Sequence, residues 1–140
     1  MNLWILGVPI VVLIAVVIFF ANKIRARKFS NREDVSFENI YSANFQSLGV
    51  PRDLVNELWS EAAKTLRIEP TKLRPADRFD KELNYHLPWL PFVDLNDDFY
   101  WAAVARLKRL NADKKLFENA KTLGEYIITF ARLEAAARGA

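Results

Sequence analysis

One residue whose type could do acid, base or metal chemistry stands out because it has no counterpart. His86 is the only histidine among the 140 residues, and it lies between Tyr85 and Leu87 in a proline-rich stretch. A metal ligand or a general base needs partners in a defined geometry. The chain offers neither a second histidine nor any cysteine. We therefore interpret His86 as a structural or solvent-facing residue.

An acidic run resembles the start of a calcium-binding loop. Asp94, Asn96 and Asp98 follow the D-x-N-x-D spacing of such a loop. The EF-hand loop then requires glycine at its sixth position and glutamate at its twelfth. Those positions hold Phe99 and Ala105, so the calcium interpretation fails. Capping of a helix N-terminus accounts for the acidic run instead.

The sequence also contains few residues that could act as nucleophiles or bind phosphate. The lack of cysteine excludes disulfides, thiol nucleophiles and thiolate metal centres. The four glycines are far apart, which excludes a phosphate-binding loop, and the last serine of the chain is Ser60. We predict no catalytic residue, no cofactor and no metal, and hence that the protein is not an enzyme. An enzyme of unrecognised type stays as an alternative.

The densest group of aromatic residues follows the histidine. Phe99 and Tyr100 fit the apolar stripe of a helix and are predicted to lie in the core. Trp101 falls off that stripe, and such an aromatic side chain either packs on a second surface or anchors a partner. Both interpretations stay open. The residues that we predict to touch a partner protein are Trp89, Phe92, Asp97, Asp98 and Trp101.

The N-terminal segment is uncharged. Residues 3–21 contain no charged, amide or hydroxyl side chain, and as a helix they would extend about 28 Å, close to the hydrocarbon thickness of a bilayer. We predict a transmembrane helix with Trp4 at the interface. A cleavable signal peptide is less consistent, because no basic residue precedes the apolar run. The residues that delimit the predicted span are Leu3, Trp4, Phe19, Phe20 and Ala21.

A basic cluster follows the apolar segment directly. It consists of Lys23, Arg25, Arg27, Lys28 and Arg32, with no acidic residue among them. The positive-inside rule then places the N-terminus outside and the rest of the chain in the cytoplasm, and we expect a single-pass protein of a bacterial inner membrane or other plasma membrane. The same cations are expected to contact anionic lipid.

Charge balance changes after the basic cluster. From residue 33 onward there are 15 lysines and arginines against 17 aspartates and glutamates, so this part carries a net charge of −2 although the whole chain carries +3. A nucleic-acid-binding domain needs a basic face. We therefore expect a lipid bilayer and a protein as partners, and no nucleic acid.

Helical spacing dominates the remainder of the chain. Four helices are predicted, at 36–48, 51–68, 96–110 and 122–133, with a long proline-containing connection at 69–91 that folds back onto the core. Thr122 and Glu125 form a capping box for the last helix. No strand pattern is present, so the predicted fold class is all-α. The expected parts are an anchor at 1–22, a basic linker at 23–35 and a helical bundle at 36–140.

Two stretches of this bundle resemble a known family. DLVNELWSEAAKTLRIEPTKLRPADRFDKEL is similar to the first helix and first loop of acyl carrier proteins, and KTLGEYIITF is similar to their last helix. The resemblance covers about residues 51–133. It implies a small helical carrier fold, and in the family a serine of an Asp-Ser-Leu motif, at the start of the second long helix, carries phosphopantetheine.

This chain departs from the family at that serine. The matching stretch, from Val93 to Phe99, has no serine, and Asp94-Leu95 keeps only the flanks of the motif. The stretch LNYHLPWLPFV is an insertion relative to the family. We therefore expect a membrane-anchored, non-catalytic carrier-like domain that binds protein in a membrane complex. The alternative is a membrane-tethered acyl carrier in lipid assembly.

Overall fold

The computed structural model describes residues 3–84, 86–87, 90–94 and 97–139. The chain divides into two compact units, Met1–Arg32 and Glu33–Ala140.

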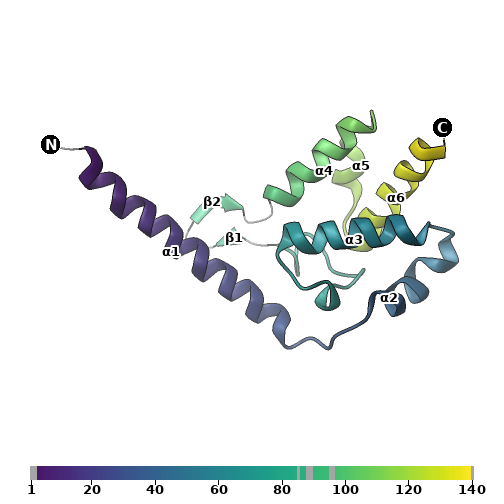
Figure 1. Ribbon diagram of the computed structural model, residues 1–140, viewed down its shortest axis with the longest axis horizontal. Helices are drawn as coiled ribbons and strands as arrows, with labels where there is room; N and C mark the ends of the chain where they lie inside the picture. The colour runs from purple at the N-terminus through teal and green to yellow at the C-terminus, as the bar shows by residue number, and fades with distance from the viewer. Residues whose placement is uncertain (1–2, 85, 88–89, 95–96, 140) are drawn as a thin grey trace. The chain divides into compact units, whose positions relative to one another are not determined.

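The first unit is a single helix, α1 (Leu3–Ser30), drawn in purple in Figure 1. Within it, Gly7–Ser30 is long and apolar enough to cross a membrane, which confirms the predicted apolar N-terminal helix. Large apolar side chains such as Val11 and Phe19 are about two-thirds exposed, at 66% and 64%. Such exposure of hydrocarbon along a helix is typical of a membrane-spanning segment.

The basic cluster lies at the C-terminal end of this helix. Helix α1 continues to Ser30, so residues 23–30, which the sequence assigns to a linker, are helical. Arg32 follows the helix, and its guanidinium carbon lies 4.6 Å from the centre of the Phe29 ring. Lysine and arginine in the last turns of a helix are favourable next to its negative dipole end.

The second unit consists mainly of helices. In chain order its elements are α2 (Phe37–Asn44), the 3₁₀ turn η1 (Gln46–Leu48), α3 (Arg52–Leu66), the 3₁₀ turn η2 (Pro70–Lys72), β1 (His86–Leu87), β2 (Leu90–Asp94), α4 (Asp97–Arg109), α5 (Lys115–Asn119) and α6 (Leu123–Gly139). The predicted all-α class is confirmed. The first predicted helix is present as α2 plus η1, and the short helix α5 was not predicted.

Local sequence explains where the helices begin and end. The Ser36 hydroxyl accepts a hydrogen bond from the Asn39 N–H at 3.3 Å and so caps α2. Gly49 closes η1 with a φ of 65°, a left-handed conformation that glycine adopts without strain. The capping box of α6 is confirmed, because Glu125 N–H donates to the Thr122 hydroxyl and Thr122 N–H donates back to the Glu125 carboxylate.

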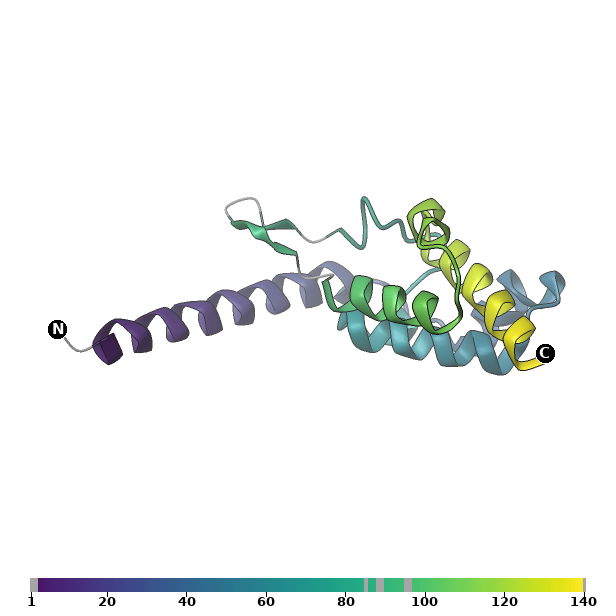
Figure 2. The ribbon, with the colours of Figure 1, turned by 90° about the horizontal axis from the view of Figure 1, so that it is seen from above.

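Helix α3 is the centre of this unit. It contacts α4 and α6, and Figure 2 shows these helices gathered on one another. Its apolar stripe is buried, as predicted, through Leu54, Val55, Leu58, Trp59, Ala62 and Leu66. Opposite this stripe, α6 contributes Ile127 and Phe130, which are fully buried. The core therefore forms where the amphipathic faces of the three long helices meet.

The long connection after α3 folds back onto the core, as predicted. Leu73 and Leu83 are buried, and the Phe79 ring stacks on Phe99 of α4 at 5.5 Å. The connection also meets the start of α6, where Gly124 N–H donates to the Pro75 carbonyl at 2.8 Å. A Cβ at Gly124 would lie 3.0 Å from both Cβ and O of Pro75. Only glycine fits this close approach without displacing backbone.

One short element contradicts the expectation that no strand occurs. Strands β1 and β2 pair antiparallel, with His86 opposite Asp94 and Leu87 opposite Leu90. Proline has no N–H to donate to a neighbouring strand and is therefore rare in strands. Because the sequence has prolines at positions 88 and 91, its pattern does not indicate a hairpin here. The hairpin falls in the stretch that is inserted relative to acyl carrier proteins.

Candidate partner-binding surface on helix α4

Helix α4 brings together three of the five residues predicted to touch a partner. Asp97 and Asp98 lie in its first turn and are exposed. Trp101, one turn further on, is 63% exposed. Phe92 belongs to β2, but its side chain lies outside the described part, and Trp89 lies outside the described residues altogether. The structure thus places Asp97, Asp98 and Trp101 on one exposed end of α4.

Tyr100 is also part of this surface, and its predicted place in the core is wrong. Its side chain is 37% exposed, whereas Phe99 is buried as predicted. Successive residues of a helix are turned by about 100° around its axis. Because Phe99 points into the core, Tyr100 lies at the edge of the core. The Tyr100 ring meets Trp101 edge to face at 5.3 Å. We refer to Asp97, Asp98, Tyr100 and Trp101 as the α4 surface.

An aromatic cluster of the half-buried Phe117 and the buried Phe99 and Tyr126 adjoins the α4 surface. Tyr100 packs edge to face against Phe117 of α5 at 5.6 Å. Phe117 in turn lies 6.0 Å from Phe99 and 5.9 Å from Tyr126. Ring pairs at these separations attract one another. The exposed rings therefore rest on a fixed platform, which lowers the entropic cost of binding a partner.

Behind the α4 surface, a charged network joins the three long helices. Arg106 of α4 is 9% exposed and lies 2.5 Å from the carboxylate of Glu134 on α6, which is 3% exposed. Arg106 also pairs with Glu61 of α3, and Arg109 shares the Glu134 carboxylate. The pairing was missed because its partners are 45 and 28 positions away in the sequence.

The electrostatics of this network favour its charged form. Burial works against the charge of Arg106, but the Glu61 carboxylate and the hydrogen bond to Glu134 outweigh it, so the pKa of Arg106 is raised. Tyr126 lies nearby, and burial together with the Glu61 charge raises its pKa so far that the phenol stays neutral. Arg106 therefore stays charged and is the centre of a structural ion cluster.

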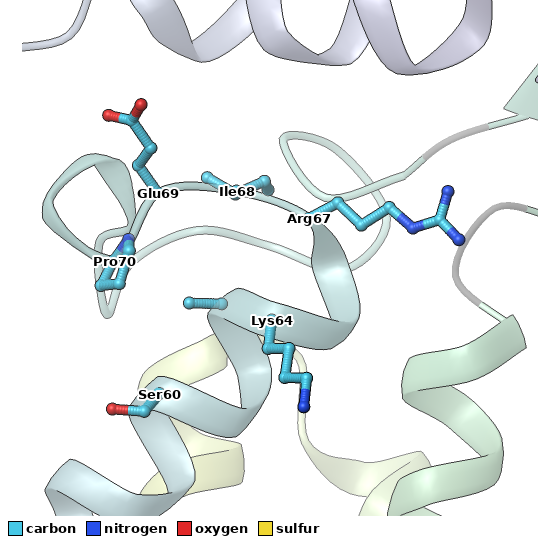
Figure 3. Close-up of a pocket in the computed structure, with 7 residues that line it drawn as sticks. Ser60, Lys64, Arg67, Ile68, Glu69 and Pro70 are labelled. Carbon is cyan, nitrogen blue, oxygen red and sulfur yellow. The ribbon is translucent and has the colours of Figure 1, made fainter. Parts of the chain in front are cut away.

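A hollow of about 410 Å³ lies at the C-terminal end of α3 (Figure 3). Its lining residues are Ser60, Ala63, Lys64, Arg67, Ile68, Glu69 and Pro70. We refer to it as the α3 hollow. Figure 3 shows the Ser60 hydroxyl and the Lys64 amine pointing in different directions, so the amine is not placed to activate the hydroxyl.

The remaining residues with possible chemistry do not assemble. His86 lies on β1, but its side chain is outside the described part. Among the described residues, no three histidines, cysteines or carboxylates are grouped so that they could hold a metal ion. Asp94 ends β2 and Asp98 lies in α4, while Asn96 lies outside the described residues.

Comparison with known proteins places the chain in no established group. No protein-family model, no curated protein and no solved structure matches it. The function must therefore be argued from the sites described above.

Proposed function

We propose that this protein is anchored in a membrane by α1 and binds a partner protein through the α4 surface. The observation that carries the proposal is the exposure of Trp101, 63%, on a helix whose opposite face is in the core. Tryptophan and tyrosine are the side chains that most often dominate protein interfaces. The α4 surface presents one of each, beside two carboxylates.

The orientation in the membrane follows from charge. Lys23, Arg25, Arg27 and Lys28 stand at the end of α1, and Arg32 follows. Loops rich in lysine and arginine stay in the cytoplasm. We propose that the N-terminus is outside, that the helical unit is cytoplasmic and that the membrane is a bacterial inner membrane.

The order of elements supports a carrier-like origin for the helical unit. Helix α3 is followed by a long connection, then by α4, and α6 closes the unit, which is the order that the resemblance to acyl carrier proteins implies. The position of the attachment serine falls just before α4, and no serine follows Ser60 in the chain. We therefore propose a non-catalytic domain in an assembly of membrane proteins.

Co-purification tests the proposed binding. The full chain is extracted from membranes in mild detergent, and the proteins retained with it are identified for the wild type and for Trp101→Ala. The control is Leu48→Ala, which removes another exposed apolar side chain, 44% exposed, from η1. We expect one partner to be lost with Trp101→Ala and retained with Leu48→Ala. Retention of all partners by both variants would contradict the proposal.

The second candidate function is an acyl carrier held at the membrane. It is favoured by the same order of elements and by Asp94, which keeps one flank of the attachment motif. The intact mass of the purified protein distinguishes the two candidates. Our proposal predicts the unmodified mass, and an increase equal to one phosphopantetheine group would establish the carrier instead.

A further inference from the structure

The segment that enters the helical unit is fastened at one place, next to η2. Val35 N–H donates to the Thr71 carbonyl at 3.0 Å. The Thr71 hydroxyl donates to the Asp34 carboxylate at 2.5 Å, and Lys72 pairs with the same carboxylate at 3.2 Å. Arg74 donates to the Glu33 carbonyl. Glu33 to Val35 therefore belong to the surface of the helical unit and do not act as a free tether.

The connection between helix α1 and this attachment is consequently short. Only Asn31 and Arg32 separate Ser30, the last residue of α1, from Glu33. An extended chain covers at most about 3.5 Å per residue, so this connection reaches about 10 Å. Residues 22–30 add about 14 Å of helix beyond the predicted span. With the predicted span of 3–21, the covalent chain keeps Glu33, which is attached next to η2, within about 25 Å of the hydrocarbon.

The α3 hollow lies beside this attachment point. Pro70 is both the first residue of η2 and part of the lining of the hollow. The other apolar lining residues are Ala63 and Ile68, and Lys64 and Arg67 add two cations against the single carboxylate of Glu69. The hollow is thus locally basic in a unit whose net charge is −2.

Arg67 occupies an unusual backbone position. It ends α3 with a φ of 56°, in the left-handed region where glycine is the usual residue. Its guanidinium lies 3.8 Å from the Asp98 carboxylate, with both side chains more than half exposed. An ion pair this exposed is weak and is readily exchanged for another anion.

We propose that the α3 hollow, with Lys64 and Arg67 at its edge, docks onto anionic phospholipid of the membrane that α1 crosses. The inference rests on the membrane anchoring proposed above. Anionic headgroups complement the two cations, and the apolar floor of Ala63, Ile68 and Pro70 suits the boundary between headgroups and acyl chains. Docking fixes one face of the helical unit on the bilayer.

Hydrogen exchange of the full chain in lipid nanodiscs tests this docking. One set of discs contains phosphatidylcholine alone, and the other contains phosphatidylcholine with phosphatidylglycerol. We expect amide exchange in residues 60–74 to be severalfold slower in the anionic discs, and this difference to disappear in high salt. Exchange in α6 is expected to be the same in both.

Two double variants with equal charge changes provide the comparison. Lys64→Glu with Arg67→Glu removes the cations of the hollow, whereas Lys108→Glu with Arg132→Glu changes two exposed cations of α4 and α6. We expect only the first pair to abolish the slowing in anionic discs. Exchange in α6 at the wild-type rate verifies that the Lys64→Glu, Arg67→Glu variant is folded. If this variant is unfolded, the salt dependence of the exchange in wild-type residues 60–74 tests the lipid docking instead.

The outcomes separate this inference from the proposed function. Equal exchange of residues 60–74 in both kinds of disc, with the chain retained in them, would overturn the lipid docking alone. Equal loss of the slowing in both double variants would also overturn it, because the effect would then reflect total charge. Failure of the chain to remain in the discs would instead refute the membrane anchoring.

Discussion

Arg106 of α4 and Glu134 of α6 form an ion pair at 2.5 Å, although each is at least nine-tenths buried. Arg109 binds the same carboxylate from the solvent side, and Glu61 binds the other side of Arg106. Charges removed from water are stable only when well paired. Together with the buried apolar residues Phe99, Ala103 and Leu107, this pair holds α4 against α3 and α6 and so positions the α4 surface.

Loss of the Glu134 carboxylate should destabilise the helical unit strongly. In Glu134→Leu the buried Arg106 charge keeps its pair with Glu61 and a longer one with Glu57 at 3.9 Å, but loses its only buried partner. We expect the free energy of unfolding to fall by about 3 kcal/mol. Denaturant titration followed by circular dichroism measures this change. Asp80→Ala is the control, since its pair with Arg78 is exposed and should contribute less than about 1 kcal/mol. Equal effects of the two variants would contradict the account.

Gly124→Ala should also destabilise the unit, even though alanine usually favours a helix. The new methyl group would meet backbone and ring atoms of Pro75 at 3.0 Å, and such overpacking costs about 1–3 kcal/mol. Gly139→Ala near the end of the same helix meets nothing within 4 Å and should have no unfavourable effect. Thermal unfolding of both variants measures the difference. If Gly124→Ala is as stable as the wild type, the connection does not pack on α6 as described.

The attachment of Asp34 predicts a pH dependence at acidic pH. The hydrogen bond from Thr71, and then that from Lys72, lowers the pKa of Asp34 below its ordinary value of 3.8. A carboxylate with a lowered pKa stabilises the folded state fully above its unfolded pKa, and this contribution disappears as the pH falls through the folded pKa. The stability difference between wild type and Asp34→Asn should therefore be constant near neutral pH and vanish below pH 3.8.

Titration of Asp34 itself checks the same point. The side-chain carboxyl resonance should show a midpoint below 3.8 in the wild type. Thr71→Val removes the main donor while keeping the side-chain shape, and should move that midpoint upward. A midpoint that does not change would mean that Asp34 is not fastened to η2.

Local signals in the sequence were sufficient to predict most of the helical framework. The Ser36 cap, the Gly49 terminus and the Thr122–Glu125 box each depend on neighbouring residues, and all three are present in the structure. The position of Trp101 away from the core stripe of its helix was also predicted correctly, because helical spacing depends only on nearby residues.

Features that depend on tertiary contacts could not be predicted in this way. The Arg106 network joins residues from three helices, and nothing in the neighbourhood of Arg106 indicates its partners. Tyr100 satisfies the helical spacing of a core residue, yet Phe99 and the α5 residue Phe117 leave it at the edge. Periodicity identifies which side of a helix is apolar, but the neighbouring elements decide how much of that side is covered.

Substitution of Trp101 should affect binding and leave folding unchanged. The side chain is mostly exposed, and changes at exposed positions usually alter stability by less than about 0.5 kcal/mol. Denaturant titration of Trp101→Ala should therefore match the wild type. A large loss of stability would mean that Trp101 packs within the protein.

Photo-crosslinking in intact membranes tests the central claim most directly. A photoreactive amino acid is placed at position 101 of the full chain, and in a matched control at position 48, which is exposed on η1. The account predicts one discrete protein adduct from position 101 and none from position 48. No adduct from position 101, or the same adduct from both positions, would contradict a partner-binding role for the α4 surface.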